Sequence, residues 1–294
     1  MKLPPFTLHR PSSISEATGL LREFRDDGVI YCGGTELLLV MKLGLSGFDH
    51  LIDIKRIPGL DAISVSGTTL RIGAAATHRS IETNSEIRER WPGLAAMTRQ
   101  VANVRVRNVG TLGGNLAFAD PASDPATFLL AHDATVEVRS GEGVIRQIPI
   151  GEFHVGAYQP ALDDFDLIEA ILVPELAQGT AVTHERVRFH ERPAVTVTVV
   201  GSAQAGSITD VRVAVGSVGP TAIRVPEMEE ALDGVDASSL ESRLVDAAQI
   251  VAERVEPIDD LNGSMEYKRH LASVMTERAT RRCLVSAIEA SLTP

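Results

Sequence analysis

Apolar positions follow two different spacings along the first part of the chain. Residues 12–27 place apolar side chains three and four positions apart, which predicts an amphipathic helix. Residues 29–31 form a short β-type run, a glycine pair at 33–34 ends it, and residues 36–43 return to helical spacing. Residues 51–54 predict another short strand. This order is typical of an α/β unit with a glycine turn at the carboxyl end of its strand.

The middle of the chain mixes strands and helices. Residues 61–74 predict a hairpin that turns at Ser66 and Gly67. Helices are predicted at 77–90, 93–103 and 125–132, a glycine-rich loop at 109–115, and a strand at 134–139.

From about residue 180 the pattern changes to long β-type runs. Runs at 195–200, 208–215 and 222–225 predict a small antiparallel sheet, and helices follow at 238–254 and 264–290. The chain as a whole predicts an α+β fold. We expect a first domain of residues 1–178, with subdomains of about 1–55 and 56–178, and a C-terminal α+β domain of residues 179–294.

Composition excludes several classes of protein. A net charge of -11 and 4% aromatic residues disfavour nucleic acid as a partner, because phosphates attract basic surfaces and bases stack on aromatic rings. No apolar run approaches the ~20 residues of a membrane span, and the N-terminus has no stretch of signal-peptide character. We therefore expect a cytoplasmic protein without a membrane span.

The few cysteines limit the redox chemistry of this chain. Cys32 and Cys283 are too few to hold an iron–sulfur cluster, and no Cys/His spacing fits zinc. We expect no metal ligand here, so redox chemistry would need an organic cofactor.

No set of side chains predicts a catalytic site. There is no G-x-S-x-G elbow, and the acidic clusters at 163–166 and 259–260 are typical of solvated loops and caps. His184 and His190 lie beside arginines in an expected strand, which favours a surface or ligand-neighbouring role. Cys32 fits a small residue that lets the backbone approach a ligand better than it fits a nucleophile. We predict no catalytic residue.

The first glycine-rich segment is Tyr31-Cys32-Gly33-Gly34-Thr35-Glu36. A strand ends and a helix begins there, so free N–H groups could attract an anion such as a pyrophosphate. Thr35 could cap the helix or bind a phosphate. A tight turn with an ordinary N-cap explains the same residues, because a Gly-Gly turn is much less specific than a dinucleotide fingerprint.

The second segment is Gly110-Thr111-Leu112-Gly113-Gly114-Asn115, with an acidic stretch at 120–124 after it. Asn115 and Asp124 could fix a ribityl or ribose hydroxyl, although a β-bulge loop with aspartates as turn formers fits equally well. Two such segments favour a ligand with two phosphates and a long polar middle. Neither is a Rossmann fingerprint or a P-loop.

Together these segments resemble the FAD-binding (medium) subunits of molybdenum hydroxylases, the family of xanthine dehydrogenase and carbon monoxide dehydrogenase. Residues 32–37 with Met41-Lys42 are similar to that family's A-G-G-T-D/E-L…M-K, and residues 107–115 to its R-N-x-G-T-I-G-G-N. Residues 119–124 continue the match, and residues 266–271 are similar to its E-Y-R-x-x-L. The resemblance covers essentially the whole chain.

The resemblance implies a two-part FAD-binding domain of the vanillyl-alcohol-oxidase (PCMH-like) type and a particular set of FAD contacts. Both glycine segments would hold the pyrophosphate and its neighbours through backbone N–H groups. The residues that it implies are Ile30, Tyr31, Cys32, Gly33, Gly34, Thr35, Glu36, Leu37, Val101, Gly110, Thr111, Leu112, Gly113, Gly114, Asn115, Asp124, Ile168 and Arg188.

This sequence departs from the family pattern at three points. Cys32 replaces the usual alanine, and Arg188 stands where the family often has lysine, which keeps the charge but changes its geometry. Gly-Gly-Thr-Glu in the first segment is closer to the xanthine dehydrogenase type than to the Gly-Gly-His-Ser of carbon monoxide dehydrogenases. That difference lowers the expectation that the substrate is carbon monoxide.

The resemblance also implies a function and partners. The chain would be an oxidoreductase subunit that takes electrons from a small 2Fe-2S subunit and passes them through FAD to an external acceptor. A large subunit with the molybdenum cofactor would oxidise the substrate, in a dimer of heterotrimers. The alternatives are a stand-alone FAD-dependent oxidase of the same fold and a binding module that has kept the fold without activity.

Overall fold

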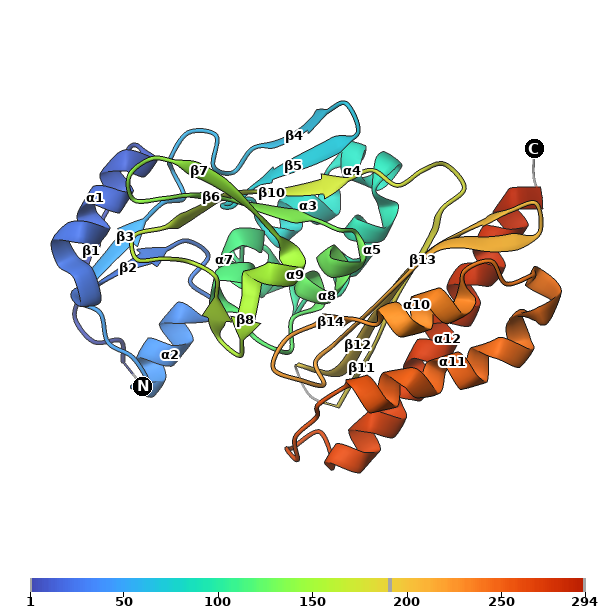
Figure 1. Ribbon diagram of the computed structural model, residues 1–294. Coiled ribbons are helices and arrows are strands. Elements are labelled where there is room, and N and C mark those ends of the chain that lie inside the picture. Colours follow the sequence, from blue (N-terminus) through green and yellow to red (C-terminus); the bar gives the residue numbers. More distant parts are fainter. Residues whose placement is uncertain (1, 190–191, 293–294) are drawn as a thin grey trace.

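The computed structural model describes residues 2–189 and 192–292 and has the predicted α+β fold (Figure 1). A parallel sheet near the N-terminus has the strand order β1-β3-β2. Its strands are β1 (Thr7–His9), β2 (Gly28–Tyr31) and β3 (His50–Asp53), and its connections contain α1 (Ile14–Phe24), a 3-10 turn (Arg25–Asp27) and α2 (Leu37–Leu43). Ser13 caps α1 by accepting a hydrogen bond from the N–H of Glu16, which agrees with the predicted helix start.

The middle of the chain forms an antiparallel sheet with the order β4-β5-β10-β6-β7. Its strands are β4 (Ile63–Ser66), β5 (Thr69–Gly73), β6 (Thr135–Arg139), β7 (Ile145–Pro149) and β10 (Leu167–Pro174). The helices of this part are α3 (His78–Thr83), α4 (Ser85–Arg90), α5 (Pro92–Gln100), α6 (Val104–Arg107), α7 (Leu112–Phe118), α8 (Asp124–Ala131) and α9 (Ile150–Phe153), and a small pair of strands is β8 (His154–Gly156) with β9 (Gln159–Pro160). In Figure 1, α5, α7 and α8 lie between this sheet and the C-terminal sheet.

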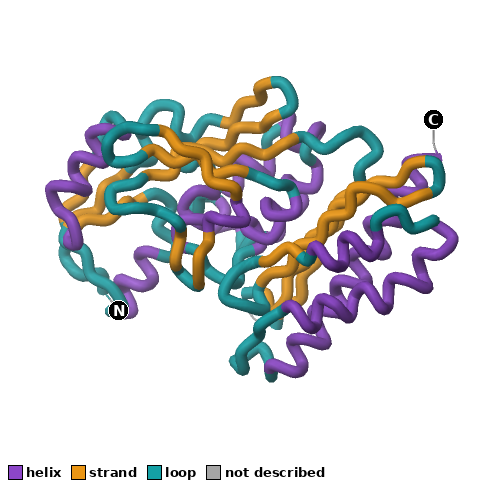
Figure 2. Tube along the Cα trace, in the orientation of Figure 1, coloured by secondary structure: helices purple, strands orange, loops and turns teal. Residues whose placement is uncertain are grey.

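The C-terminal part is an antiparallel sheet, β11-β12-β13-β14, with helices on one face (Figure 2). Its elements are β11 (Ala181–Arg188), β12 (Pro193–Gln204), β13 (Ser207–Gly216), β14 (Ile223–Arg224), α10 (Pro226–Leu232), a 3-10 turn (Ala237–Ser239), α11 (Leu240–Arg254) and α12 (Met265–Leu292). Alternation along β12 divides its side chains between two environments. Val195, Val197 and Val199 belong to the core shared with the C-terminal helices, whereas Thr196 hydrogen-bonds to Thr127 of α8.

The contact between α8 and the C-terminal sheet is close. The hydroxyls of Thr127 and Thr196 are 2.8 Å apart, and a Cβ on Gly216 would lie 2.0 Å from Oγ1 of Thr127. Glycine at 216 therefore lets β13 approach the start of α8, where residues of the candidate site lie.

Two of the expected elements are wrong in detail. Residues 77–90 are two helices, because Asn84 accepts a hydrogen bond from the N–H of Ile87 and starts α4 afresh. The expected loop at 109–115 ends in the first turn of α7, which Thr111 caps by accepting from the N–H of Gly114. The strands β1, β7 and β10 were not predicted from the sequence.

Candidate functional site

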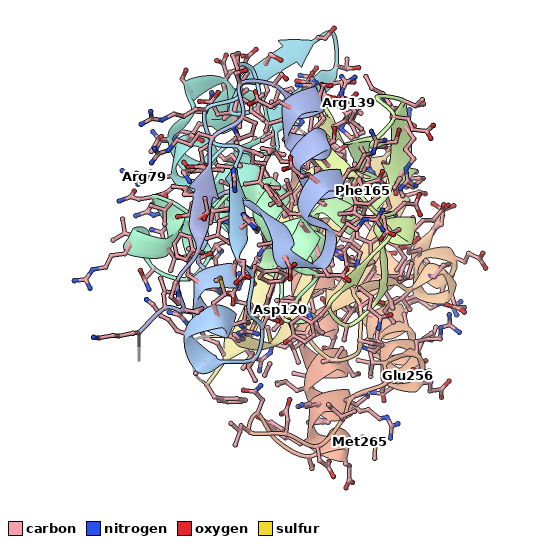
Figure 3. All side chains as sticks on the ribbon, turned by 90° about the vertical axis from the view of Figure 1, so that its left-hand side faces the viewer. Arg79, Asp120, Arg139, Phe165, Glu256 and Met265 are labelled. Carbon is pink, nitrogen blue, oxygen red and sulfur yellow. The ribbon has the colours of Figure 1, made fainter. Side chains whose placement is uncertain are left out.

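A cavity of about 510 Å³ is lined by residues of the N-terminal part, the middle part and the start of the C-terminal sheet. It brings together most of the residues that the sequence predicts for FAD. Those on its wall are Ile30, Cys32, Gly33, Gly34, Thr35, Glu36, Leu37, Val101, Thr111, Gly113, Gly114, Asn115, Asp124 and Ile168. In Figure 3, Asp120 and Phe165, two further lining residues, are labelled on the viewed face of the molecule.

Four of the predicted residues do not line this cavity. Tyr31 lines a neighbouring hollow of about 770 Å³ that shares Cys32, Gly33, Gly34, Thr35 and Thr111 with it. Leu112 is buried in the main core, and Gly110 packs beneath the loop against Val106. Arg188 is exposed at the end of β11.

Two arginines that the sequence reading did not select lie on the cavity wall instead. Arg186 is two positions before Arg188 on β11, and Arg192 lies just before β12. On a regular strand Arg186 and Arg188 would point to the same face. A register shift between Val187 and Arg188 breaks this alternation, so the two side chains do not lie together at the cavity. His190, weighed above with His184, lies outside the described residues.

The first glycine segment has its shape for steric reasons. Gly34 has φ +70°, in the left-handed region, and a Cβ there would lie 2.4 Å from the Tyr31 ring. A Cβ on Gly33 would lie 2.5 Å from the carbonyl oxygen of Val109 and 2.7 Å from Cα of Gly110. The two glycine segments therefore touch at Gly33, backbone against backbone, and together form one wall of the cavity.

The second segment uses its N–H groups within the protein. The N–H groups of Leu112 and Gly113 donate to the carbonyls of Ala76 and Ala74, and that of Gly114 donates to Oγ1 of Thr111. These three N–H groups already have acceptors within the protein. Gly113 is needed for packing, because a Cβ there would lie 2.6 Å from Cβ of Ala74. A Cβ on Gly114, which also lines the cavity, would lie 2.8 Å from Oγ1 of Thr111, the hydroxyl that caps the helix.

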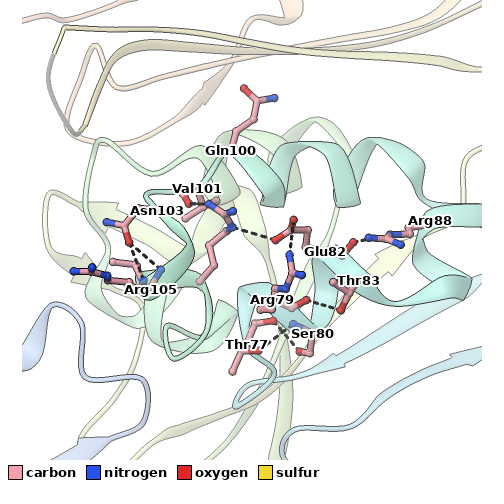
Figure 4. Close-up of polar contacts among 12 residues, drawn as sticks. Thr77, Arg79, Ser80, Glu82, Thr83, Arg88, Gln100, Val101, Asn103 and Arg105 are labelled. Carbon is pink, nitrogen blue, oxygen red and sulfur yellow. Dashed lines mark hydrogen bonds and ion pairs between the residues drawn. The ribbon is translucent and has the colours of Figure 1, made fainter.

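A buried network supports the turn that follows α5 (Figure 4). Glu82 accepts hydrogen bonds from Arg79 and Arg107, and Arg107 also donates to the carbonyl of Val101. Burial works against the charge of Glu82, but the hydrogen bonds from Arg107 and Arg79 outweigh it and lower the pKa of this carboxyl. Arg107 thus holds Val101 at the cavity wall without lining it.

Two titratable side chains in the cavity wall are held in their neutral forms. Burial, with the neighbouring Arg107 charge, lowers the pKa of His78 to about 4. Burial raises the pKa of the Cys32 thiol. Because a thiolate is the reactive form, this agrees with the interpretation of Cys32 as a small wall residue.

Asp124 connects the middle of the chain to the C-terminal sheet. It opens α8 and is 5% exposed, and its Oδ2 accepts from Nη1 of Arg186 at 2.5 Å. Arg186 also donates from Nη2 to the carbonyl of Gln100, the last residue of α5. One guanidinium from β11 therefore joins the ends of two helices at the cavity wall.

Arg192 makes a second connection across the site. It forms ion pairs with Asp120, after α7, and with Glu36, 3.1 Å away at the start of α2. It is half-exposed, so these pairs are partly screened by solvent. They nevertheless link the first glycine segment, the end of the second and the C-terminal sheet.

These observations fit FAD as the ligand. A long ligand with a diphosphate needs a wall without side chains at its middle, and the glycine segments provide one. It also needs apolar surface for its rings, which Val29, Ile54 and Ile168 contribute. Asp124 Oδ1 is a buried acceptor that makes no hydrogen bond within the described residues, and it suits a ligand hydroxyl. Among the described residues no cluster of metal-ligating side chains occurs, and no helix is long and apolar enough to cross a membrane.

The fold and site define a protein that holds an elongated dinucleotide between its parts, and comparison with known proteins agrees. Residues 4–176 match the FAD binding domain in molybdopterin dehydrogenase, and residues 190–283 match the CO dehydrogenase flavoprotein C-terminal domain. The chain is 33% identical to the carbon monoxide dehydrogenase medium chain of Hydrogenophaga pseudoflava, over 94% of this chain and 96% of that one. It is 34% identical to the nicotine 6-hydroxylase medium subunit of Paenarthrobacter nicotinovorans, over 95% and 97%.

The solved structures give the same result. Carbon monoxide dehydrogenase from Hydrogenophaga pseudoflava superposes with a TM-score of 0.93 at 32% identity, covering 97% of this chain and 99% of that chain. The chain therefore belongs to the family of FAD-binding subunits of molybdenum hydroxylases. It is an oxidoreductase component with FAD as its cofactor, and the predicted two-part FAD-binding fold is confirmed.

Proposed function

We propose that this chain is the electron-transfer subunit of a heteromeric molybdenum-containing hydroxylase, which takes electrons from an iron–sulfur subunit and delivers them to an external acceptor. The observation that carries the proposal is the cavity of about 510 Å³ that brings both glycine segments together with Asp124 and Ile168 and is lined by neutral or paired side chains. Nothing in that lining is arranged as a nucleophile with its base. The similarity to medium chains and subunits over nearly their whole lengths supports the same role.

The residues of the cavity divide the work of holding the cofactor. We propose that N–H groups of the first segment, at residues 33–36, bind the pyrophosphate, whereas the second segment contributes its Cα surface and the side chain of Asn115. Asp124 would accept from a cofactor hydroxyl, and Arg186, not Arg188, would supply the positive charge of β11 at the site. FAD, when bound, supplies an organic centre that exchanges electrons, and the protein's part is to bind it and orient it.

The partners follow from the same proposal. A small 2Fe-2S subunit would deliver electrons, and a large subunit with the molybdenum cofactor would oxidise the organic substrate, as a dimer of heterotrimers. We also propose that the chain divides near residue 178 into the expected domains, 1–178 and 179–294. The two matched segments, which end at 176 and begin at 190, support this division. A second apolar core, made only of residues after 178, also supports it, although Val200 and Ala214 of the C-terminal part pack in the first core.

Reconstitution and co-purification test the proposal. The purified chain, incubated with FAD and passed over a desalting column, should retain flavin absorbance and oxidise no small molecule alone. Co-expressed with the products of its neighbouring genes, it should purify with an iron–sulfur and a molybdenum subunit. A colourless protein after reconstitution would contradict the FAD site. A lone chain that oxidises a substrate would support the stand-alone oxidase.

A further inference from the structure

His184 and Asp124 face each other across the contact between the C-terminal sheet and α8. Nε2 of His184 is 3.5 Å from Oδ1 of Asp124, and the two side chains are 4% and 5% exposed. Within the described residues neither of these two atoms makes a hydrogen bond. A buried polar atom without a partner costs about 1–3 kcal/mol, so the position of this pair calls for a reason.

The surroundings of His184 decide which ring nitrogen carries the proton. Nδ1 lies 2.8 Å from Oγ1 of Thr198, and the ring stands edge-on to Phe128, whose ring also stacks on His132. A bare Nε2 would point its lone pair at the carboxylate of Asp124, which is repulsive. The favourable arrangement has Thr198 donating to Nδ1 and the Nε2–H directed at Asp124.

The second carboxylate oxygen of Asp124 is held from the same strand. Arg186 donates to Oδ2 at 2.5 Å, and residues 184 and 186 point to the same face of β11 because side chains alternate along a strand. One oxygen thus faces an arginine and the other a histidine. Together these two side chains define the plane of a carboxylate that lies on the cavity wall.

We propose that His184 is a positioning residue for the cofactor site: its Nε2–H orients the Asp124 carboxylate so that Oδ1 can accept from a hydroxyl of FAD. The inference rests on the FAD site of the proposed function. It assigns part of the affinity for FAD to β11 of the C-terminal sheet, whereas most residues that line the cavity lie between 21 and 168.

Two substitutions separate the two ring nitrogens. His184→Asn keeps a polar atom near the position of Nδ1, within reach of Thr198, but has nothing that reaches Asp124. His184→Gln places its amide near the position of Nε2. The dissociation constant of FAD, from quenching of flavin fluorescence on the purified full chain, should rise about tenfold in the Asn variant and less than about threefold in the Gln variant. The free energy of unfolding of the FAD-free proteins, measured in urea, should change by a similar amount in both variants.

Two further measurements test the same role even if substitutions of His184 disturb the fold. Thr198→Val keeps the shape of the side chain on β12 but removes the hydroxyl that sets the tautomer of His184. It should also weaken FAD binding several-fold. In an Asp124→Asn background, His184→Asn should cause no further loss of affinity.

The outcomes separate this inference from the proposed function. If the unmodified chain fails to bind FAD, the proposed function fails. If the unmodified chain binds FAD, and the Asn variant and Thr198→Val bind it equally well, only the positioning role is overturned. Equal losses in the Asn and Gln variants would likewise overturn it, since a packing role does not distinguish the two nitrogens.

Discussion

Arg186 and Asp124 form a buried ion pair between β11 and the start of α8, with Nη1 and Oδ2 2.5 Å apart and side chains 9% and 5% exposed. The same guanidinium reaches the carbonyl of Gln100, so it also fixes the end of α5. Both helix ends lie beside the cavity. The contact that docks the C-terminal sheet on α5 and α8 therefore also shapes the cofactor site.

Removal of Arg186 should be costly for both stability and binding. Arg186→Met leaves the Asp124 carboxylate buried without its cation, which costs about 3–5 kcal/mol in the free energy of unfolding. Urea unfolding of the FAD-free protein measures this loss, and FAD retained on a desalting column measures the loss of the site. Arg186→Lys should fall between, because one ammonium cannot serve both Asp124 and Gln100 in the planar arrangement of a guanidinium.

Arg188 provides the matched control. Arg188→Met removes the same charge two positions along the same strand, at an exposed end, and should change stability by less than about 0.5 kcal/mol. FAD retention should not change. Loss of FAD in Arg188→Met, with retention in Arg186→Met, would restore Arg188 as the contact that the family resemblance implies.

Gly33 should tolerate no side chain. In Gly33→Ala the new Cβ would meet the Val109 carbonyl at 2.5 Å, and both partners are backbone, so the two glycine segments must separate. We expect a loss of about 1–3 kcal/mol in unfolding free energy and a larger relative loss of FAD affinity. Thermal unfolding with and without FAD measures both effects. Gly47→Ala, with no atom within 4 Å of its Cβ, should behave as the unmodified chain.

Local signals predicted much of the fold because their causes are local. The cap at Ser13 and the left-handed turn at Gly34 depend on a few neighbouring residues, and they lie at the predicted start of the first helix and within the predicted glycine turn. The first turn of α7 was not predicted, because Gly113 and Gly114 have low helix propensity. The carbonyls of Ala74 and Ala76, distant in sequence, accept the N–H groups that open this helix.

The choice between Arg186 and Arg188 shows why part of the site could not be predicted. On a regular strand both arginines would point to one face, and a motif match cannot separate them. The register shift between Val187 and Arg188 sends only Arg186 toward Asp124. That shift arises from pairing with β12, so it leaves no mark in the sequence of β11.

Acid should destabilise the protein through its buried histidines. Burial lowers the pKa of His78 and of His132 to about 4. Between pH ~6.5 and 4 these histidines are therefore protonated in the unfolded chain but neutral in the folded chain. The stability is therefore complete above pH ~6.5 and falls as the pH approaches 4. Each histidine contributes about 1.4 kcal/mol per pH unit, or roughly 3 kcal/mol over the range.

The slope of unfolding free energy against pH checks this prediction. His132→Gln removes one of the two groups at a position away from the cavity, and the slope between pH 6.5 and 4 should fall by about half of the histidine contribution. An unchanged slope in His132→Gln would show that His132 is not buried in its neutral form.

The contact at Gly216 should control the cofactor site from a distance. A Cβ there would lie 2.0 Å from Oγ1 of Thr127 and 2.8 Å from Oγ1 of Thr196, so Gly216→Ala breaks the hydrogen bond between these two hydroxyls and pushes β13 away from α8. Overpacking of this kind costs about 1–3 kcal/mol in unfolding free energy. Since α8 begins at Asp124, the same movement draws that carboxylate away from Arg186, and the affinity for FAD should fall with the stability. Gly219→Ala, whose nearest atoms are 3.8 Å away, should change neither quantity. A Gly216→Ala protein that is destabilised yet binds FAD normally would show that the site does not depend on the docking of the C-terminal sheet.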